Sequence, residues 1–212
     1  VTAAVVLPED FDVLGVDDSK KLSEKRREEL YDAIIDGCVA YGIGMSDHEV
    51  IDEINILQAT KEAMKKAIAE CEKMLGAVTA GQFEQAGGQP GQQEMQLQPG
   101  QPGQTGQAGG QSGQASAPTR HVDYILFDAL TIDGLARPQE AVIKGDAKVL
   151  AIAAASIVAK VTRDRMMVKY AEEYPWYAFE KNKGYGTAAH YAGIREHGPC
   201  PIHRMTFLKT IH

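Results

Sequence analysis

The sequence has no apolar run close to the roughly 18 to 20 residues that a membrane-spanning helix needs, so no membrane segment is expected. The apolar start from Val1 to Pro8 is too short for a signal peptide and has no basic residues before it. Cysteine is also scarce, because Cys38, Cys71 and Cys200 are scattered and have no metal-ligand spacing. Such a set is typical of reduced thiols, so we expect a cytoplasmic protein.

An excess of positive charge is missing as well, because the 212 residues carry a formal net charge of −7. That balance argues mildly against a nucleic-acid partner. Net charge is a poor guide, however, where a site gathers carboxylates around metal ions, since those acids enter the same sum. Basic residues do cluster locally, at Lys20 with Lys21, at Lys25 with Arg26 and Arg27, at Lys181 with Lys183, and at Arg204 with Lys209.

The composition is otherwise that of a globular domain, with 44% hydrophobic and 24% charged residues. Residues 80–119 depart from it, because they consist mainly of Gln, Gly, Pro and Ala with only Glu84 and Glu94 charged. Such a stretch is typical of a flexible linker, and an interaction or aggregation segment is the alternative. We therefore expect one domain in two parts, residues 1–79 and 120–212, separated by a disordered insertion at 80–119.

Hydrophobic patterning predicts alternating strands and helices, and hence an α/β domain. Strands are expected at 1–7, 39–45, 122–127 and 141–143, and helices at 23–37, from 46 to beyond 75, and from 149 to about 170. Ser46 followed by Glu49 has the spacing of a capping box that opens the second helix. The third helix is so rich in alanine that another element must approach it closely. The remaining residues are expected to be more loop than helix.

Three aspartates are candidates for chemistry, although each also has a simpler structural interpretation. Asp128 follows a buried apolar strand, where α/β folds place their sites, but it can equally be a turn or cap residue. Asp146 precedes a helix and can be its N-cap. Asp164 lies between two arginines and can pair with its neighbours. No single acid decides the function.

The combination of acids is more specific than any of them alone. Two acids at the ends of separate elements, with lysine-rich loops nearby, fit a two-metal phosphoryl-transfer site. Carboxylates bind Mg²⁺ or Mn²⁺ through oxygen. In such a site one metal activates water and the other stabilises the leaving oxygen, while basic and hydroxyl side chains position the phosphate backbone.

Six short motifs occur in order along the chain outside residues 80–119. They are DSKKLS at 18–23, INILQAT at 54–60, KGD at 144–146, IAAASIVAKVTRD at 152–164, KGYGT at 183–187 followed by His190, and GPCPIHR at 198–204. In sequence and in order they resemble ribonuclease HII, a family of metal-dependent nucleases. Six motifs in register make coincidence implausible.

The resemblance implies a ribonuclease H-like fold, a mixed five-stranded sheet with helices on both faces followed by a helical C-terminal portion. It implies hydrolysis of a phosphodiester bond with two Mg²⁺ or Mn²⁺ ions, on the 5′ side of a ribonucleotide, leaving 3′-hydroxyl and 5′-phosphate ends. The substrates would be the RNA strand of RNA–DNA hybrids and single ribonucleotides embedded in duplex DNA, in replication and ribonucleotide excision repair. A cytoplasmic monomer is expected.

The resemblance also implies roles for individual residues. Asp128 and Asp146 match two of the family's four acidic positions and would be catalytic metal ligands. Tyr185 matches the tyrosine that stacks on the sugar at the ribonucleotide–deoxyribonucleotide junction, and the simpler alternative is a turn tyrosine in a Gly-rich loop. Further residues expected to contact substrate are Ser19, Lys20, Lys144 and Lys183. Supporting roles are expected for Asn55, Ser156, Arg163, Asp164 (bracing its helix), His203 and Arg204.

The sequence departs from the family pattern at its start. The family opens with a strand that carries adjacent Asp and Glu, followed by a Gly-Arg-Gly loop that grips the 2′-hydroxyl. Here the 212 residues begin without Met, and 1–8 resemble the family's second strand. We therefore expect an unpaired sheet edge and little or no hydrolysis by these residues alone. A smaller departure is Asn182, where the family often has His, and it affects substrate positioning.

Two functions from different classes fit these observations. The first is a nuclease whose remaining catalytic strand lies outside the 212 residues. The second is a non-catalytic paralogue that binds hybrids without cutting them and is joined to partners by the Gln/Gly-rich segment. The coding sequence just upstream of Val1 distinguishes them, because an in-frame Asp-Glu-x-Gly-Arg-Gly supports the nuclease. An unrelated Mg²⁺-dependent phosphotransferase fits the acids but not the ordered motifs.

Overall fold

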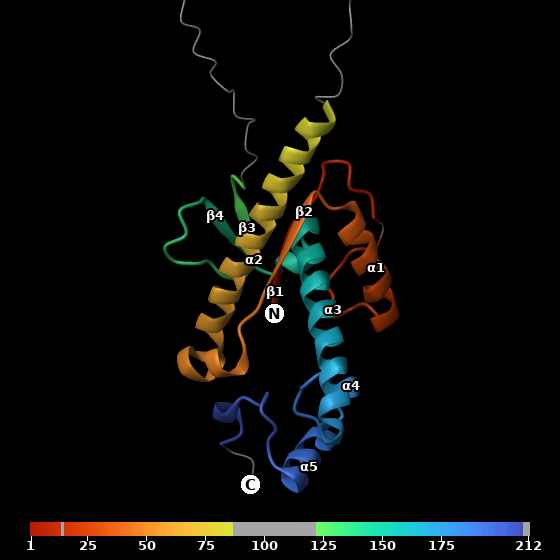
Figure 1. Ribbon diagram of the computed structural model, residues 1–212, viewed down its shortest axis with the longest axis vertical. Helices are drawn as coiled ribbons and strands as arrows, with labels where there is room; N and C mark the ends of the chain where they lie inside the picture. The colour runs from red at the N-terminus through yellow and green to blue at the C-terminus, as the bar shows by residue number, and fades with distance from the viewer. Residues whose placement is uncertain (14, 87–121, 210–212) are drawn as a thin grey trace, which may run out of the picture.

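The computed structural model describes residues 1–13, 15–86 and 122–209, and its strands form two ribbons (Figure 1). Strand β1 (Thr2–Val6) pairs antiparallel with β2 (Ala40–Gly44). Strand β3 (Ile125–Asp128) pairs in parallel with β4 (Gln139–Val142). Within the described ranges no strand links the two ribbons. All four strands were predicted, and the domain is mixed α/β as expected.

The described part of the chain contains five α-helices. They are α1 (Glu24–Gly37), α2 (His48–Ala86), α3 (Leu150–Glu173), α4 (Phe179–Asn182) and α5 (Ala188–His197). The C-terminal part is more helical than composition predicted, because Thr187 caps α5 and four apolar residues give this part a core of its own. Helix α2 also continues to Ala86, past the predicted start of the insertion at residue 80, while 87–119 lie outside the described residues.

Both faces of the β1–β2 ribbon are covered by helices, as Figure 1 shows. Ala3 and Val5 pack into a core formed by α1 and α3, whereas Ala4 and Val6 pack toward α2. This alternation follows from the two-residue period of a strand, which sends neighbouring side chains to opposite faces. The predicted arrangement of a sheet between two helical layers is therefore confirmed for this ribbon.

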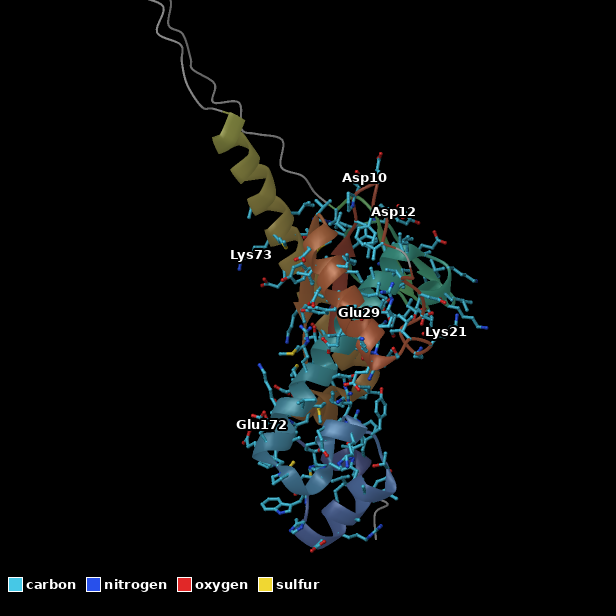
Figure 2. All side chains as sticks on the ribbon, turned by 90° about the vertical axis from the view of Figure 1, so that its right-hand side faces the viewer. Asp10, Asp12, Lys21, Glu29, Lys73 and Glu172 are labelled. Atoms are coloured by element: carbon cyan, nitrogen blue, oxygen red, sulfur yellow. The ribbon has the colours of Figure 1, made fainter. Side chains whose placement is uncertain are left out.

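Helix α1 shows how a single element separates core from solvent. Its inner face carries Leu30 and Ile34, which are fully buried against the alanine-rich α3, so the predicted close approach to that helix is confirmed. Glu29 lies on the outer face, which is turned toward the reader in Figure 2. Among the described residues, no helix is both long enough and apolar enough to cross a membrane.

Two helix starts depend on capping, and one of them differs from the prediction. Ser23 caps α1 as expected, because its side chain accepts a hydrogen bond from the Arg26 N–H. The capping box predicted at Ser46 is wrong. Asp47 accepts the Val50 N–H at 2.9 Å, while the Ser46 hydroxyl donates to the Ala59 carbonyl oxygen at 2.9 Å. The Ser46 side chain is thus used to join the loop to the middle of α2.

A close approach of β2 to α2 gives a stability prediction. A Cβ added at Gly44 would lie 1.8 Å from the Ala63 carbonyl oxygen, whereas one added at Gly76 would meet nothing within 4 Å. Gly44→Ala should therefore destabilise the fold by about 1–3 kcal/mol or more, because backbone must move. Gly76→Ala, in α2, should stabilise the fold by about 0.5–1 kcal/mol. Urea unfolding of both variants checks the pair, and equal effects would contradict this packing.

Candidate functional site

The two predicted carboxylates lie at the same end of the β3–β4 ribbon. Asp128 ends β3, and its Oδ1 accepts a hydrogen bond from the Gly145 N–H at 2.9 Å. Asp146 follows in the 3₁₀ turn Gly145–Ala147, which begins after Lys144 in a left-handed conformation. Because the strands are parallel, their carboxyl ends meet, and the side chain of one aspartate fixes the turn that carries the other.

The helix-cap interpretation of Asp146 is wrong. Helix α3 has Val149 as its N-cap residue, and no side chain makes a capping hydrogen bond there. The Asp146 side chain is instead only 8% exposed and lies 3.6 Å from the ammonium nitrogen of Lys20. A buried carboxylate is costly unless a positive charge or hydrogen bonds compensate it. Asp146 therefore does not cap α3, and the Lys20 ammonium partly compensates its buried charge.

The loop 18–23 brings hydroxyl and ammonium groups to this end of the ribbon. Ser19 is buried, and its hydroxyl lies 2.9 Å from the Ser156 hydroxyl of α3. Lys20 is 78% exposed along its side chain and reaches Asp146 with its charged end. Lys21 points away to solvent (Figure 2) and pairs with Asp17 at 3.4 Å. Of these three neighbours, Lys20 has the exposure and position to meet a phosphate.

Tyr185 presents its ring beside a pair of cations. The residue is 61% exposed. Lys160 Nζ lies 5.7 Å from the ring centroid, and the guanidinium carbon of Arg163 lies 5.2 Å from it. Asp164 is buried and forms an ion pair with Lys160, one turn earlier on α3, at 2.7 Å. An exposed aromatic face flanked by cations suits stacking near a phosphate backbone.

The turn before Tyr185 is supported from beneath. Asn182 is buried, donates to the Tyr177 carbonyl at 2.6 Å and accepts the Gly184 N–H at 2.8 Å. Lys183 has a side chain only 10% exposed, held by Glu24 at 3.4 Å and by the Glu180 carbonyl. This arrangement favours a supporting role for Lys183, although the sequence suggested substrate contact. Asn182, at the position where the family often has His, hydrogen-bonds to the backbone on both sides of it.

A groove of about 450 Å³ separates the two ribbons. Its walls are β1 on one side and β3 on the other, and α2 and α3 close it with apolar residues. In the described part of the chain these two strand edges have no hydrogen-bonding partner. Asp128 and Ser156 line the groove, so one more strand placed in it would run beside the first predicted metal ligand.

Asp128 and Asp146 are oxygen donors of the kind that a divalent cation binds, but they are only two carboxylates. Mg²⁺ commonly binds through one or two carboxylates, several waters and substrate phosphates. Asp128 and Asp146 supply oxygen donors of this kind at one end of the ribbon. Within residues 1–13, 15–86 and 122–209, no group of three or more His, Cys, Asp or Glu could hold a metal ion.

The remaining predicted residues lie in and near the C-terminal part. Asn55 bends α2 with φ of 69° and caps the following turn, accepting the Leu57 and Gln58 N–H groups at 3.0 and 3.1 Å. Arg204 lies over the Phe207 ring, and burial, followed by repulsion from Arg163, lowers the pKa of its guanidinium. His203 is buried beside His190. These contacts are structural, and none of those described involves Asp128 or Asp146.

Two residues of interest were absent from the sequence-based set. Lys160 was recognised only as part of a motif, although its spacing of three and four residues from Arg163 and Asp164 places all three on one helix face. His190 was noted after the KGYGT motif without a role. Its burial and its contact with the Tyr185 carbonyl at 2.9 Å depend on tertiary packing.

Comparison with known proteins gives one consistent result. The family model for Ribonuclease HII matches residues 1–103 and 115–210. The chain is 44% identical over 207 residues to Ribonuclease HII of Enterococcus faecalis and 43% identical over 207 residues to that of Bacillus subtilis, covering 98% of this chain and 62% of each relative. It is 43% identical over 211 residues to Ribonuclease HII of Alkaliphilus oremlandii, of which it spans 83%. The chain thus spans less than two thirds of several relatives.

Proposed function

Because this chain belongs to the ribonuclease HII family, we propose that it forms most of an endonuclease that cuts the RNA strand of RNA–DNA hybrids and single ribonucleotides in duplex DNA. The observation that carries the proposal is the placement of Asp128, Asp146 and Lys20 together at one end of the β3–β4 ribbon. The protein would act on the 5′ side of the ribonucleotide, as a monomer in the cytoplasm, during replication and repair.

The chemistry of the site follows from its charges. Asp128 and Asp146 would hold Mg²⁺ or Mn²⁺, which supplies Lewis acidity at the phosphate and a more acidic water. Lys20 now neutralises Asp146 across 3.6 Å, and its long exposed side chain can turn to a phosphate when substrate enters. Lys144, exposed in the turn before Asp146, adds a second cation at this edge. The chain thereby concentrates opposite charges where a phosphodiester has to be oriented.

Recognition of the ribonucleotide is assigned to Tyr185. An aromatic ring that stacks on a sugar distinguishes nucleotides by shape and by contact with the 2′-hydroxyl. Lys160 and Arg163 lie beside the ring and can meet the adjoining phosphates. Tyr185 is thus placed to read the nucleotide while its neighbours hold the strand.

A second candidate function is a protein that binds hybrids without cutting them. It is favoured by the absence, within the described ranges, of a cluster of more than two potential metal ligands. The two functions share the same binding surface and differ only in hydrolysis. Binding therefore tests the shared part of the proposal, and cleavage separates the alternatives.

Binding should show a preference that depends on the aromatic ring. In the presence of Ca²⁺, which binds oxygen ligands, the 212-residue chain should bind a duplex with one ribonucleotide more tightly than the same all-DNA duplex. Tyr185→Ala should reduce this preference by about 10-fold or more, the scale of one stacking contact. Tyr185→Phe keeps the ring and is the matched control. Equal affinity of the wild-type chain for both duplexes, measured by fluorescence anisotropy, would contradict the proposal.

A further inference from the structure

Two buried histidines in the C-terminal part are not used by the chemistry above. His190 on α5 and His203 are 6% and 7% exposed, and their Nε2 atoms lie 3.0 Å apart. Tyr177 and Phe179 surround them, with ring centroids 4.9 to 6.3 Å away. Buried polar rings need defined hydrogen-bond partners, because an unsatisfied one is costly.

The partners of the two rings determine where the protons lie. The Tyr185 carbonyl oxygen, 2.9 Å from His190 Nδ1, can only accept, so His190 carries its proton on Nδ1. In a neutral ring His190 Nε2 is then bare, and His203 must donate to it from Nε2–H. The bare Nδ1 of His203 in turn accepts the Cys200 N–H at 2.9 Å. The series runs from Cys200 through both rings to Tyr185.

The reverse proton order is disfavoured. The Cys200 carbonyl oxygen and Sγ lie 3.2 and 3.0 Å from His203 Nδ1 and could both accept a proton from it, so the order is decided at the facing Nε2 atoms. A proton on His203 Nδ1 would leave two bare Nε2 atoms facing each other, or would require a charged ring in this buried place. Burial also lowers the pKa of His203, partly offset by its contact with the Cys200 backbone, and this direction favours the neutral ring.

The end of this series is fixed a second time by the backbone. The Tyr185 carbonyl also accepts the Thr187 N–H at 2.8 Å, and the Thr187 hydroxyl accepts the His190 N–H at 3.3 Å. His190 thus hydrogen-bonds to both ends of the turn, to Tyr185 through its ring and to Thr187 through its backbone N–H. The turn leaves the Tyr185 ring exposed beside Lys160 and Arg163.

We propose that His203 and His190 are positioning residues, which fix the Tyr185 backbone through a hydrogen-bond series of one proton order and so preset its ring for the ribonucleotide. The consequence for binding rests on the function proposed for Tyr185, whereas the proton order does not. Preorganisation of this kind contributes to recognition because the turn need not be ordered when the substrate binds.

The proton order can be measured directly in the wild-type chain. Long-range ¹H–¹⁵N correlation spectra at pH 7.5 should show His190 as the Nδ1–H tautomer and His203 as the Nε2–H tautomer. His197 lies on the same helix α5 but outside the series, stacked on Trp176, and provides an internal comparison. A His190 ring protonated on Nε2, alone or together with Nδ1, would overturn the proposal.

Paired substitutions test the effect on recognition. Asparagine places its amide where Nδ1 of histidine lies, and glutamine places it where Nε2 lies. His190→Asn keeps the donor to Tyr185, and His190→Gln loses it. His203→Gln keeps the donor to His190, and His203→Asn loses it. The two variants that lose a donor should show a preference for the ribonucleotide duplex reduced by about 5- to 10-fold, the value of one hydrogen bond, with the other two close to wild type.

The pattern distinguishes positioning from bulk stability. Every substitution shrinks or reshapes a buried ring, so a purely structural role would affect the Asn and Gln variants of one histidine alike. That result, or an unchanged preference in all four folded variants, would overturn the proposal, and His197→Gln serves as the control. If the wild-type chain shows no preference, the function proposed for Tyr185 fails, and the tautomer measurement alone decides the hydrogen-bond series.

Discussion

Adding an N-terminal strand that carries an adjacent Asp and Glu to the 212 residues should raise Mg²⁺- or Mn²⁺-dependent cleavage of a single-ribonucleotide duplex by about 10³-fold or more. The groove between β1 and β3 offers the place for such a strand, since both of its walls are strand edges. A strand in it would bring two further carboxylates beside Asp128. Metal sites stabilise transition-state charge by several kcal/mol, which corresponds to this change in rate.

The control for this experiment separates chemistry from folding. An extension with Asn and Gln in place of Asp and Glu should fill the groove and raise the unfolding midpoint, because it pairs the same edges, without restoring cleavage. Cleavage by the 212 residues alone at the rate of the extended protein would show that Asp128 and Asp146 suffice. If the extension with Asp and Glu stabilises the fold but gives no cleavage, the groove is not where the remaining metal-binding carboxylates lie.

The second large effect is expected at Asp128. In the extended protein, Asp128→Asn should lower the single-turnover rate of cleavage by about 10³-fold, because a neutral amide is a poor ligand for a divalent cation. The Asn Oδ1 can still accept the Gly145 N–H, which spans 2.9 Å in the wild type, so the turn that carries Asp146 should persist. The rate under single-turnover conditions, with saturating Mg²⁺, is the appropriate measurement.

Asp133→Asn is the matched control for this loss. Asp133 follows β3 by a few residues and pairs with Lys61 at 3.0 Å, but its side chain is 94% exposed. A surface ion pair of this kind contributes little to stability, so the variant should keep wild-type activity. Unimpaired cleavage by Asp128→Asn, with an intact fold, would remove Asp128 from the metal site.

Much of the fold was predictable because its signals are local. The strands and the helices α1 and α3 were predicted from the periodic spacing of hydrophobic residues. The start of α1 was predicted from Ser23, a residue type that commonly caps helices. Asp128 and Asp146 could be selected as candidates for the same reason, since each stands at the end of a predicted element. Their proximity then depends on the parallel pairing of β3 with β4.

What sequence could not supply depends on contacts between distant residues. Ser46 and Asp47 are both good caps, and only the bond from Ser46 to Ala59 in α2 decides between them. Lys183 looks like an exposed cation in a loop until Glu24, far away in sequence, is found beside it. The helices after residue 175 are held by a small core of their own, which composition rich in Gly, Pro and His conceals.

The most direct test of the central claim is the position of the cut made by the extended protein in a duplex with one embedded ribonucleotide. Products resolved at single-nucleotide length should show one metal-dependent cut on the 5′ side of that ribonucleotide, with a 3′-hydroxyl end and no cut in the all-DNA duplex. Tyr185→Ala should weaken this preference while Asp128→Asn abolishes the cut. Cleavage of both duplexes alike, or cleavage that persists after chelation of divalent cations, would contradict the account.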